Sequence, residues 1–296
     1  MLTIIFLGVN NFTKGRIRQP ETPRNNTVQF QIRIDGTLLS YKQPIVYKYN
    51  DRVKGEVYEP FEVVPAASVA LDSKVQIFAK AQPKEIIATV TAHRDQLTGS
   101  VQLKAPKNWT ISKSQSFSNL KKGEQRSFSF TVTPPNTESE ANLIAEVTTQ
   151  EGVYQKEMVQ IDYEHIPLQT LFLPAQAKIV RLDIKRKGDY IGYIQGAGDA
   201  VPDYLRQMGY QVAIIDPTKI TPDRLSQFDA VVVGIRAYNV VEAMQQVQPL
   251  LLDYVKNGGT MIAQYNTSGR WGNTKIGPPY PLQLSRDRVT DELSEV

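Results

Sequence analysis

The sequence predicts a multidomain protein of the β plus α/β class, in which an immunoglobulin-like β-sandwich is followed by a doubly wound parallel sheet. Two observations carry this prediction. Short runs of β-branched and aromatic residues recur with turn signals between them across residues 65–164, which is typical of a sandwich. Residues 178–266 instead alternate strand-like and helix-like segments, which is typical of a parallel sheet flanked by helices.

The composition is that of an ordinary globular protein. The chain has 296 residues, of which 41% are hydrophobic and 22% are charged, and this length allows two domains and part of a third. The net charge is +4, and basic residues are scattered among acidic ones. We interpret them as a solvated surface and predict no nucleic-acid binding.

The chain contains no cysteine and only two histidines, His93 and His165. These counts exclude disulfides, thiolate metal sites and a cysteine nucleophile. Two histidines do not form a zinc site with several imidazoles unless another chain contributes ligands. We therefore predict no catalytic residue, no metal ligand and no cofactor in this chain.

Residues 1–64 are strand-rich, and we interpret them as the remnant of a preceding β domain. The apolar start, Met1–Gly8, is too short to span a bilayer and lacks the basic region of a signal peptide. We therefore predict a strand there and no membrane span. Val28–Gly36 alternates apolar and polar residues up to an Asp-Gly turn, which predicts a strand entering a hairpin. Gln19–Asn26 is predicted to be a loop.

Two features of the sandwich region give specific expectations. Ser127–Thr133 alternates strictly and places Phe128, Phe130 and Val132 on one face. Burial of that face would contribute ~1.5–3 kcal/mol for each large side chain. Trp109 is predicted to close one end of the sandwich, and an exposed tryptophan that stacks on a sugar is the alternative. Residues 165–177 are predicted to be a linker.

The α/β region, residues 178–296, shows capped helices between apolar strands. Asp199 is predicted to be the N-cap of a helix that ends before Gly209, and Thr221-Pro222 is predicted to begin the next helix. A third helix is expected over Gln248–Asn257. The predicted strands are Ile191–Gln195, Gln211–Ile215, Ala230–Ile235 and Thr260–Tyr265.

The carboxyl ends of these strands hold the candidate ligand-binding residues. Ligands of open α/β sheets bind there, next to the point where the strand order reverses. With a flavodoxin-like order, this crevice lies between the first and third strands. The candidates are Asp199, Arg236, Tyr238, Asn239, Gln264 and Asn266.

Arg236 follows an apolar strand, where its guanidinium can hold a carboxylate or a phosphate. The alternative is an Asp199–Arg236 ion pair that joins two loops. Gly196-Ala197-Gly198 is typical of a capped tight turn, and a phosphate-binding turn is disfavoured because Asp199 stands where the anion would lie. Arg286 and Arg288 either contact a ligand or pair with Asp287 and Asp291.

Five segments make the sequence resemble a known family. The chain resembles the C-terminal half of large bacterial PIG-L/LmbE-like deacetylases over most of its length from about Pro44 onward. The middle sandwich resembles the small β-domains that accompany carbohydrate-acting enzymes, and the α/β part resembles a class I glutamine-amidotransferase-like fold. The segments are Tyr163–Thr170, Ile191–Asp199, Gly234–Asn239, Gly258–Asn266 and Ser285–Glu292.

The parent family implied by this resemblance is a zinc-dependent N-deacetylase. Its zinc-binding His-Pro-Asp-Asp motif is absent here, as is the cysteine nucleophile of amidotransferases, so neither activity is transferred to any residue of this chain. The resemblance implies a catalytic domain before residue 1 and a continuation beyond residue 296. The α/β domain is then incomplete at its C-terminus, and the chain is a fragment or the product of a broken reading frame. Periplasmic or extracellular localisation is implied by the family, although no signal peptide is present.

Three functions remain as hypotheses. The first is a non-catalytic accessory region that binds a glycan or positions the deacetylase-like catalytic domain, which would be its partner. The second is an α/β hydrolase-like enzyme with a site around Asp199 and Arg236. The third is a protein–protein interaction module. The scarcity of histidine and the absence of cysteine favour the first hypothesis over the second.

Overall fold

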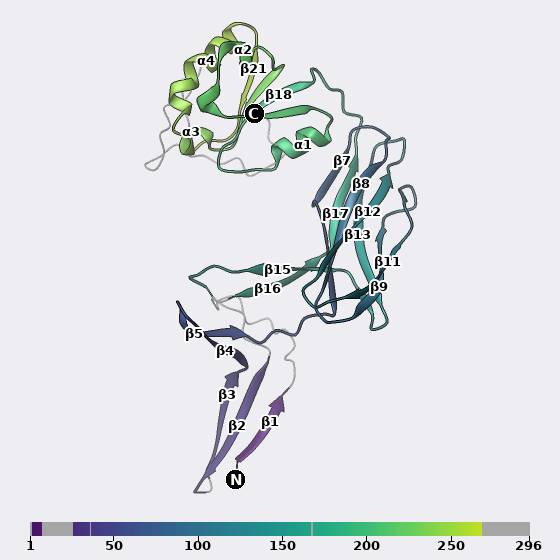
Figure 1. Ribbon diagram of the computed structural model, residues 1–296, viewed down its shortest axis with the longest axis vertical. Coiled ribbons are helices and arrows are strands. Elements are labelled where there is room, and N and C mark those ends of the chain that lie inside the picture. Colours follow the sequence, from purple (N-terminus) through teal and green to yellow (C-terminus); the bar gives the residue numbers. More distant parts are fainter. Residues whose placement is uncertain (1, 8–25, 36, 167, 268–296) are drawn as a thin grey trace.

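The computed structural model describes residues 2–7, 26–35, 37–166 and 168–267. The fold is mostly β-sheet, and the described α-helices are confined to the C-terminal part. Figure 1 shows a central sandwich with the N-terminal strands extending from one end. The helix-containing unit lies at the other end, where α1 contacts β7. A β-rich fold of several sheets is therefore what the sequence predicted at the coarsest level.

Two small sheets precede the sandwich. The apolar start of the chain forms a strand, as predicted, and most of Val28–Gly36 lies in the strand that follows. Large side chains stay exposed here, with Ile34 at 54% and Tyr47 at 61%, because no second layer among the described residues covers these sheets. The predicted loop Gln19–Asn26 lies outside the described residues except for Asn26. The first sheet contains β1 (Leu2–Leu7), β2 (Thr27–Ile34) and β3 (Thr37–Pro44), and the second contains β4 (Val46–Asp51) and β5 (Gly55–Pro60).

The sandwich consists of two facing sheets. All of its strand pairs are antiparallel except β17 with β7. One sheet has the order β10 (Thr110–Ile111), β12 (Gln125–Thr133), β8 (Lys84–Ala92) and β6 (Ala67–Leu71). The other has the order β11 (Gln115–Leu120), β9 (Leu97–Lys104), β13 (Ser139–Thr149), β17 (Gln176–Arg181) and β7 (Val75–Phe78), with β14 (Val153–Tyr154) paired to β13.

The sandwich core confirms the strict alternation in β12. Phe128, Phe130 and Val132 are all buried, because residues two apart point to the same face of a strand. Trp109 is only 5% exposed and packs edge-on against Phe78 with ring centroids 5.1 Å apart. Its indole nitrogen donates a hydrogen bond to Ser139 Oγ at 3.3 Å. Trp109 is therefore a core residue, and the alternative of an exposed sugar-stacking tryptophan is wrong.

The region predicted to be a linker is instead mostly strand. Within residues 165–177, β16 (Gln169–Pro174) pairs with β15 (Lys156–Ile161) to form a hairpin. The next strand, β17, lies between β13 and β7 inside the sandwich sheet. The sandwich therefore extends to Arg181, and residues 178–181 do not belong to the α/β unit. Pro174, one of the prolines that suggested a linker, is the last residue of β16, where a missing N–H costs little.

Glu146 on β13 is a buried carboxylate with a full set of donors. Its carboxylate accepts hydrogen bonds from Lys104 Nζ at 2.7 Å, Gln102 Nε2 at 2.7 Å and Gln155 Nε2 at 2.5 Å. Burial by itself would raise the pKa of Glu146, but the hydrogen bonds from Lys104, Gln155 and Gln102 outweigh it and hold this pKa below its ordinary value of 4.5. The ionised form therefore stabilises the fold.

Glu146→Gln is expected to lower the free energy of unfolding by about 1 kcal/mol at neutral pH, because an amide oxygen is a weaker acceptor than a carboxylate. The value is modest since the Lys104 side chain is 51% exposed and regains water. The carboxylate contributes above its unfolded pKa, and this contribution disappears as the pH falls through the lower folded pKa. Urea unfolding at roughly pH 7 and roughly pH 3 should show the larger loss at the higher pH.

Glu140 on the same strand provides the matched control. It pairs with Lys178 at 2.6 Å, but its side chain is 63% exposed. Glu140→Gln is expected to change stability by less than about 0.5 kcal/mol. An equal loss for both variants, or a loss for Glu146→Gln that is as large at the acidic pH, would contradict the role assigned to Glu146.

The C-terminal unit is built on a four-stranded parallel sheet. Its strand order is β19-β18-β20-β21, and all three neighbouring pairs are parallel. Val231, Val233 and Ile194 are fully buried, as expected for strands covered on both faces. The strands are β18 (Tyr190–Ile194), β19 (Gln211–Ile215), β20 (Ala230–Val233) and β21 (Thr260–Ala263). The helices are α1 (Val201–Gln207), η1 (Pro217–Lys219), α2 (Pro222–Leu225), α3 (Ala237–Val240) and α4 (Met244–Lys256).

The local signals for helix ends were partly correct. Thr221 is the N-cap of α2 and accepts from Arg224 N, as predicted. Gly209 follows the C-cap of α1 with φ of 99°, also as predicted. The N-cap of α1 is Ala200, and Asp199 lies one residue earlier, so the prediction of Asp199 as N-cap was wrong. The third predicted helix begins at Met244 and not at Gln248, and α3 was not predicted.

Candidate ligand-binding crevice

The predicted candidate residues follow three neighbouring strands of the parallel sheet. β18 is the first strand of the unit in sequence and lies between the second, β19, and the third, β20. The chain therefore changes direction across the sheet between β18 and β20, which is where ligands of such sheets bind. Asp199 follows β18, Arg236 follows β20, and Gln264 follows β21 directly.

The loops after β18 and β20 are in direct backbone contact. Ala197 N donates to Ile235 O at 2.8 Å, and Gly234 N donates to Ile194 O at 2.8 Å. A Cβ on Gly196 would overlap Ile235 O and lie 2.9 Å from Ala237 N. Glycine at position 196 is therefore required for this approach, and the two loops form one rigid edge.

The buried side chain of Tyr193 connects these loops through hydrogen bonds. Tyr193 on β18 is 1% exposed, and its hydroxyl lies 2.7 Å from each carboxylate oxygen of Asp199. The Gln264 side chain also hydrogen-bonds to this hydroxyl. Burial, then the hydrogen bond and charge of Asp199, raise the pKa of Tyr193 well above its ordinary value of 10.0. The hydroxyl consequently stays protonated and acts as a donor to Asp199.

Asp199 also accepts hydrogen bonds from two backbone amides. Val201 N lies 3.0 Å from Oδ1, and Ile235 N lies 3.4 Å from Oδ2. The carboxylate therefore occupies the position in which a bound anion would receive these donors. An ion pair between Asp199 and Arg236, the predicted alternative, does not form in the structure.

Arg236 occupies the sharp turn between β20 and α3. Its backbone is left-handed, with φ of 56° and ψ of 18°, and its N–H donates to Tyr265 O at 2.7 Å. This conformation costs a residue with a Cβ roughly 1–2 kcal/mol. The arginine is exposed, and it forms no ion pair with any residue that the structure describes. The turn therefore exposes Arg236 at the edge formed by the carboxyl ends of the strands.

Three other predicted residues have structural roles in the same place. Tyr238 is buried, and its hydroxyl donates to Gln248 Oε1 at 2.5 Å. Asn266 accepts from Tyr238 N at 3.2 Å, and Asn239 accepts from Thr267 N at 2.9 Å. These bonds attach α3 to the segment after β21. Of the predicted candidates that the structure describes, Arg236 is the one whose side chain is left available to a ligand.

Several predictions fall on residues outside the described part of the chain. They concern the segment Ser285–Glu292, which includes Arg286, Asp287, Arg288 and Asp291.

The two histidines lie away from the crevice. His93 follows β8, and its Nε2 is 2.8 Å from Ser68 Oγ. Burial lowers the pKa of His93 below its ordinary value of 6.5. His165 lies in the β15–β16 connection and stacks on Tyr163 with ring centroids 5.8 Å apart. Across the described ranges, no three His, Asp or Glu side chains gather as metal ligands do.

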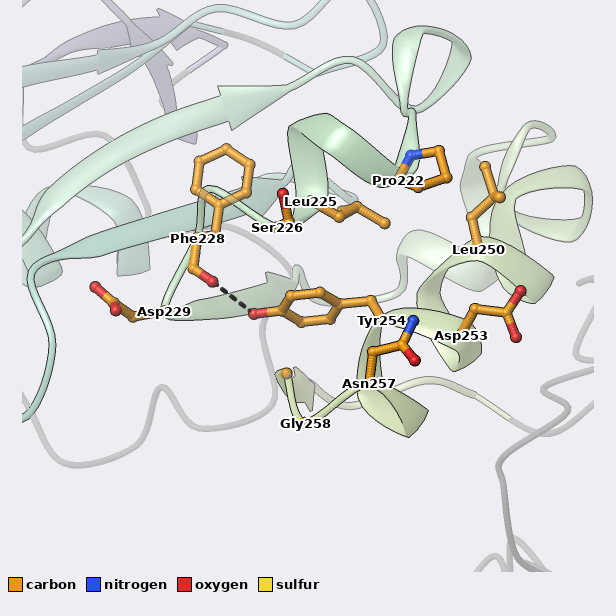
Figure 2. Close-up of a pocket in the computed structure, with 11 residues that line it drawn as sticks. Pro222, Leu225, Ser226, Phe228, Asp229, Leu250, Asp253, Tyr254, Asn257 and Gly258 are labelled. Atoms are coloured by element: carbon orange, nitrogen blue, oxygen red, sulfur yellow. Dashed lines mark hydrogen bonds between the residues drawn. The ribbon is translucent and has the colours of Figure 1, made fainter.

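A separate cavity of about 390 Å³ lies at the opposite edge of the parallel sheet (Figure 2). Phe228 and Asp229 precede β20, and Gly258 precedes β21, so this edge is formed by the amino ends of the strands. Tyr254 OH donates to Phe228 O at 2.9 Å across the cavity. Ser226 Oγ donates to Asp223 O at 2.8 Å, so its hydroxyl proton is engaged by the backbone. The cavity also lies at the edge opposite to the one at which ligands of such sheets bind.

The sequence analysis missed Tyr193 and the contact of Gly196 with the next loop. Tyr193 sits in an apolar run, where a tyrosine is expected to pack in the core. Gly196 was assigned to a tight turn, but its constraint comes from the loop after β20. A glycine following each of two parallel strands was the signal available.

None of the described helices is long and apolar enough to cross a membrane.

Comparisons with known proteins do not assign a family. No protein-family model matches the chain, and no curated protein matches it. A C. elegans MSP family member, WR4, is 8% identical with a TM-score of 0.23, covering 38% of this chain and 97% of its own. The Reelin-N domain of F-spondin is 12% identical with a TM-score of 0.25, covering 42% of this chain and 91% of its own. Similarities this weak carry no functional argument.

Proposed function

We propose that this chain is a non-catalytic accessory region of a PIG-L/LmbE-like deacetylase and binds carbohydrate at the edge formed by the loops after β18, β20 and β21. One observation supports the binding role above the others. Arg236 is presented to solvent by a strained, left-handed turn at the point where open α/β sheets bind ligands. The association with a deacetylase-like catalytic domain rests on the sequence resemblance alone.

The chemistry around Arg236 favours recognition over turnover. A planar guanidinium offers paired N–H donors, which suit the carboxylate of an acidic sugar or two neighbouring hydroxyls. The carboxylate of Asp199, on the neighbouring loop, is already engaged by Tyr193 OH and by two backbone amides. The turn after β20 thus carries a cation where hydrolases of related architecture carry a nucleophile.

Binding is tested by calorimetric titration of the chain with an acidic oligosaccharide, such as an oligogalacturonide, and with a neutral one. Saturable binding of the acidic sugar is expected, and Arg236→Gln should weaken it about tenfold, equivalent to about 1.4 kcal/mol. Lys256→Gln is the charge-matched control, because Lys256 ends α4 next to the opposite edge of the sheet. Equal affinity for wild type and Arg236→Gln would refute the site.

A second variant separates binding from folding. Arg236→Gly should raise the free energy of unfolding by about 1 kcal/mol, because glycine adopts the left-handed conformation without strain. The same variant should lose the acidic sugar. A gain in stability together with a loss of binding is expected only if the strained backbone at position 236 serves to present the arginine side chain to the ligand.

The hydrolase alternative predicts a different result. Incubation with N-acetylated amino sugars should release no acetate if the chain is non-catalytic. Release of acetate that is abolished by Asp199→Asn would establish the enzyme hypothesis in place of ours. Failure of all glycans to bind would leave the protein–protein interaction module as the better description.

A further inference from the structure

A second cleft lies between the sandwich and the α/β unit. It has a volume of about 400 Å³ and is separate from the crevice at Arg236. Its walls come from the β7–β8 connection and the start of β8, the segment before β18, and the end of α1. Clefts between two packed units are common sites for small ligands.

The charged side chains that line this cleft all carry the same sign. They are Lys80, Lys84, Arg186 and Arg206, and no carboxylate is among the lining residues. Arg186 pairs with Asp189 at 2.7 Å and Arg206 pairs with Asp203 at 2.8 Å, so two of the four positive charges are compensated from outside the lining. Lys185 and Lys187 flank Arg186 in sequence and add to the positive potential.

Lys84 is the most enclosed of the four cations. Its ammonium donates to Ile77 O and to Gln207 O, the latter at 3.3 Å, and lies 5.2 Å from the centroid of the Phe78 ring. Burial lowers the pKa of Lys84, because no carboxylate faces it to offset the lost hydration. These carbonyl contacts explain how the cation is held in place. They do not neutralise it.

The same residues also connect the two units. Lys84 and Ile77 belong to the sandwich, and Gln207 ends α1. Gln207 Oε1 accepts a hydrogen bond from Ile77 N at 2.7 Å, next to the bond from Lys84 to Gln207 O. An anion in the cleft would therefore contact cations of both units at their junction.

We propose that this cleft binds a small polyvalent oxyanion, a phosphate ester or a polycarboxylate, and that the bound anion strengthens the attachment of the α/β unit to the sandwich. The inference is independent of the carbohydrate site, since the two regions share no residue. Four cations surround this cleft, and two of them have no carboxylate partner among the described residues. An anion bound there would gain an electrostatic attraction that a neutral ligand would not receive.

The test is a titration of the whole chain with pyrophosphate and with citrate, at a fixed ionic strength set by sodium chloride. Saturable binding and a rise in Tm are expected. The Lys80→Gln/Arg186→Gln double variant should weaken binding at least tenfold. Lys80 forms no hydrogen bond or ion pair with the residues that the structure describes and is exposed, so Lys80→Gln alone should fold normally and show part of the loss.

Two controls make the result specific. Lys113→Gln removes an exposed cation between β10 and β11 of the sandwich and should leave binding unchanged. Arg236→Gln should also leave it unchanged, so that failure of one site is distinguishable from failure of the other. Preference for pyrophosphate would identify a phosphate site, and preference for citrate a carboxylate site. Non-saturable binding, or equal binding by the double variant, would overturn the proposal.

Discussion

Gly196→Ala is expected to lower the free energy of unfolding by about 3 kcal/mol, the upper part of the usual range for an overpacked site. The added Cβ would overlap Ile235 O and lie 2.9 Å from Ala237 N. Both contacts are with backbone, so no side-chain rotation relieves them, and the loop after β20 must shift. Thermal and urea unfolding of the variant measure the effect.

Gly198 in the same loop is the control. It has φ of 100° and no atom within 4 Å of an added Cβ, so Gly198→Ala should cost only the backbone strain, about 1 kcal/mol. If the two variants lose the same stability, backbone strain explains both losses, and the contact of residue 196 with the loop after β20 does not contribute. Gly196→Ala should in addition weaken sugar binding, because the loop that moves carries Arg236. Retained affinity would show that the position of this loop does not matter for recognition.

Tyr193→Phe is expected to lower the free energy of unfolding by about 2 kcal/mol, within the range for a hydrogen bond to a charged group. The substitution leaves the buried ring in place and removes only the hydroxyl that lies 2.7 Å from both oxygens of Asp199. Tyr190→Phe on the same strand should cost less than about 0.5 kcal/mol, because the described residues offer its hydroxyl no hydrogen bond.

A double-mutant cycle with Asp199→Asn isolates this interaction. Since the two side chains contact each other directly, we expect a coupling energy of about 1 kcal/mol. Strictly additive effects would mean that the Tyr193 hydroxyl stabilises the fold independently of Asp199. In that case the backbone amides of Val201 and Ile235 alone would hold the Asp199 carboxylate.

Residue patterns with a short range were read correctly from the sequence. Alternation in Ser127–Thr133 identified a face that is buried, because side-chain direction in a strand depends only on position. Thr221-Pro222 identified the start of α2, because the cap uses atoms within a few residues. The parallel strands were located to within two residues, as with Ala230–Ile235, of which Ala230–Val233 is strand.

Features that depend on partners distant in the sequence were not predicted correctly. The prolines of residues 165–177 suggested a linker, yet β17 completes the sandwich because its partners, β13 and β7, are contributed by remote parts of the chain. The cationic cleft brings together residues near 80, 186 and 206, which no local pattern relates. Asp199 was judged as a helix cap from its neighbours, whereas Tyr193 and Ile235 decide its position.

By itself, the sequence determined the β-rich class, the buried face of β12, the N-cap of α2 and the absence of thiols, since composition, period and local capping are properties of the chain alone. Only the tertiary structure decided which of the residues after the strands remain available to a ligand. Tyr238 OH donates to Gln248, Asn239 accepts from Thr267 N and Asn266 accepts from Tyr238 N. Arg236 is instead exposed on its left-handed turn. The physical reason is that a polar side chain is free or engaged according to the donors and acceptors that folding brings within about 3 Å of it.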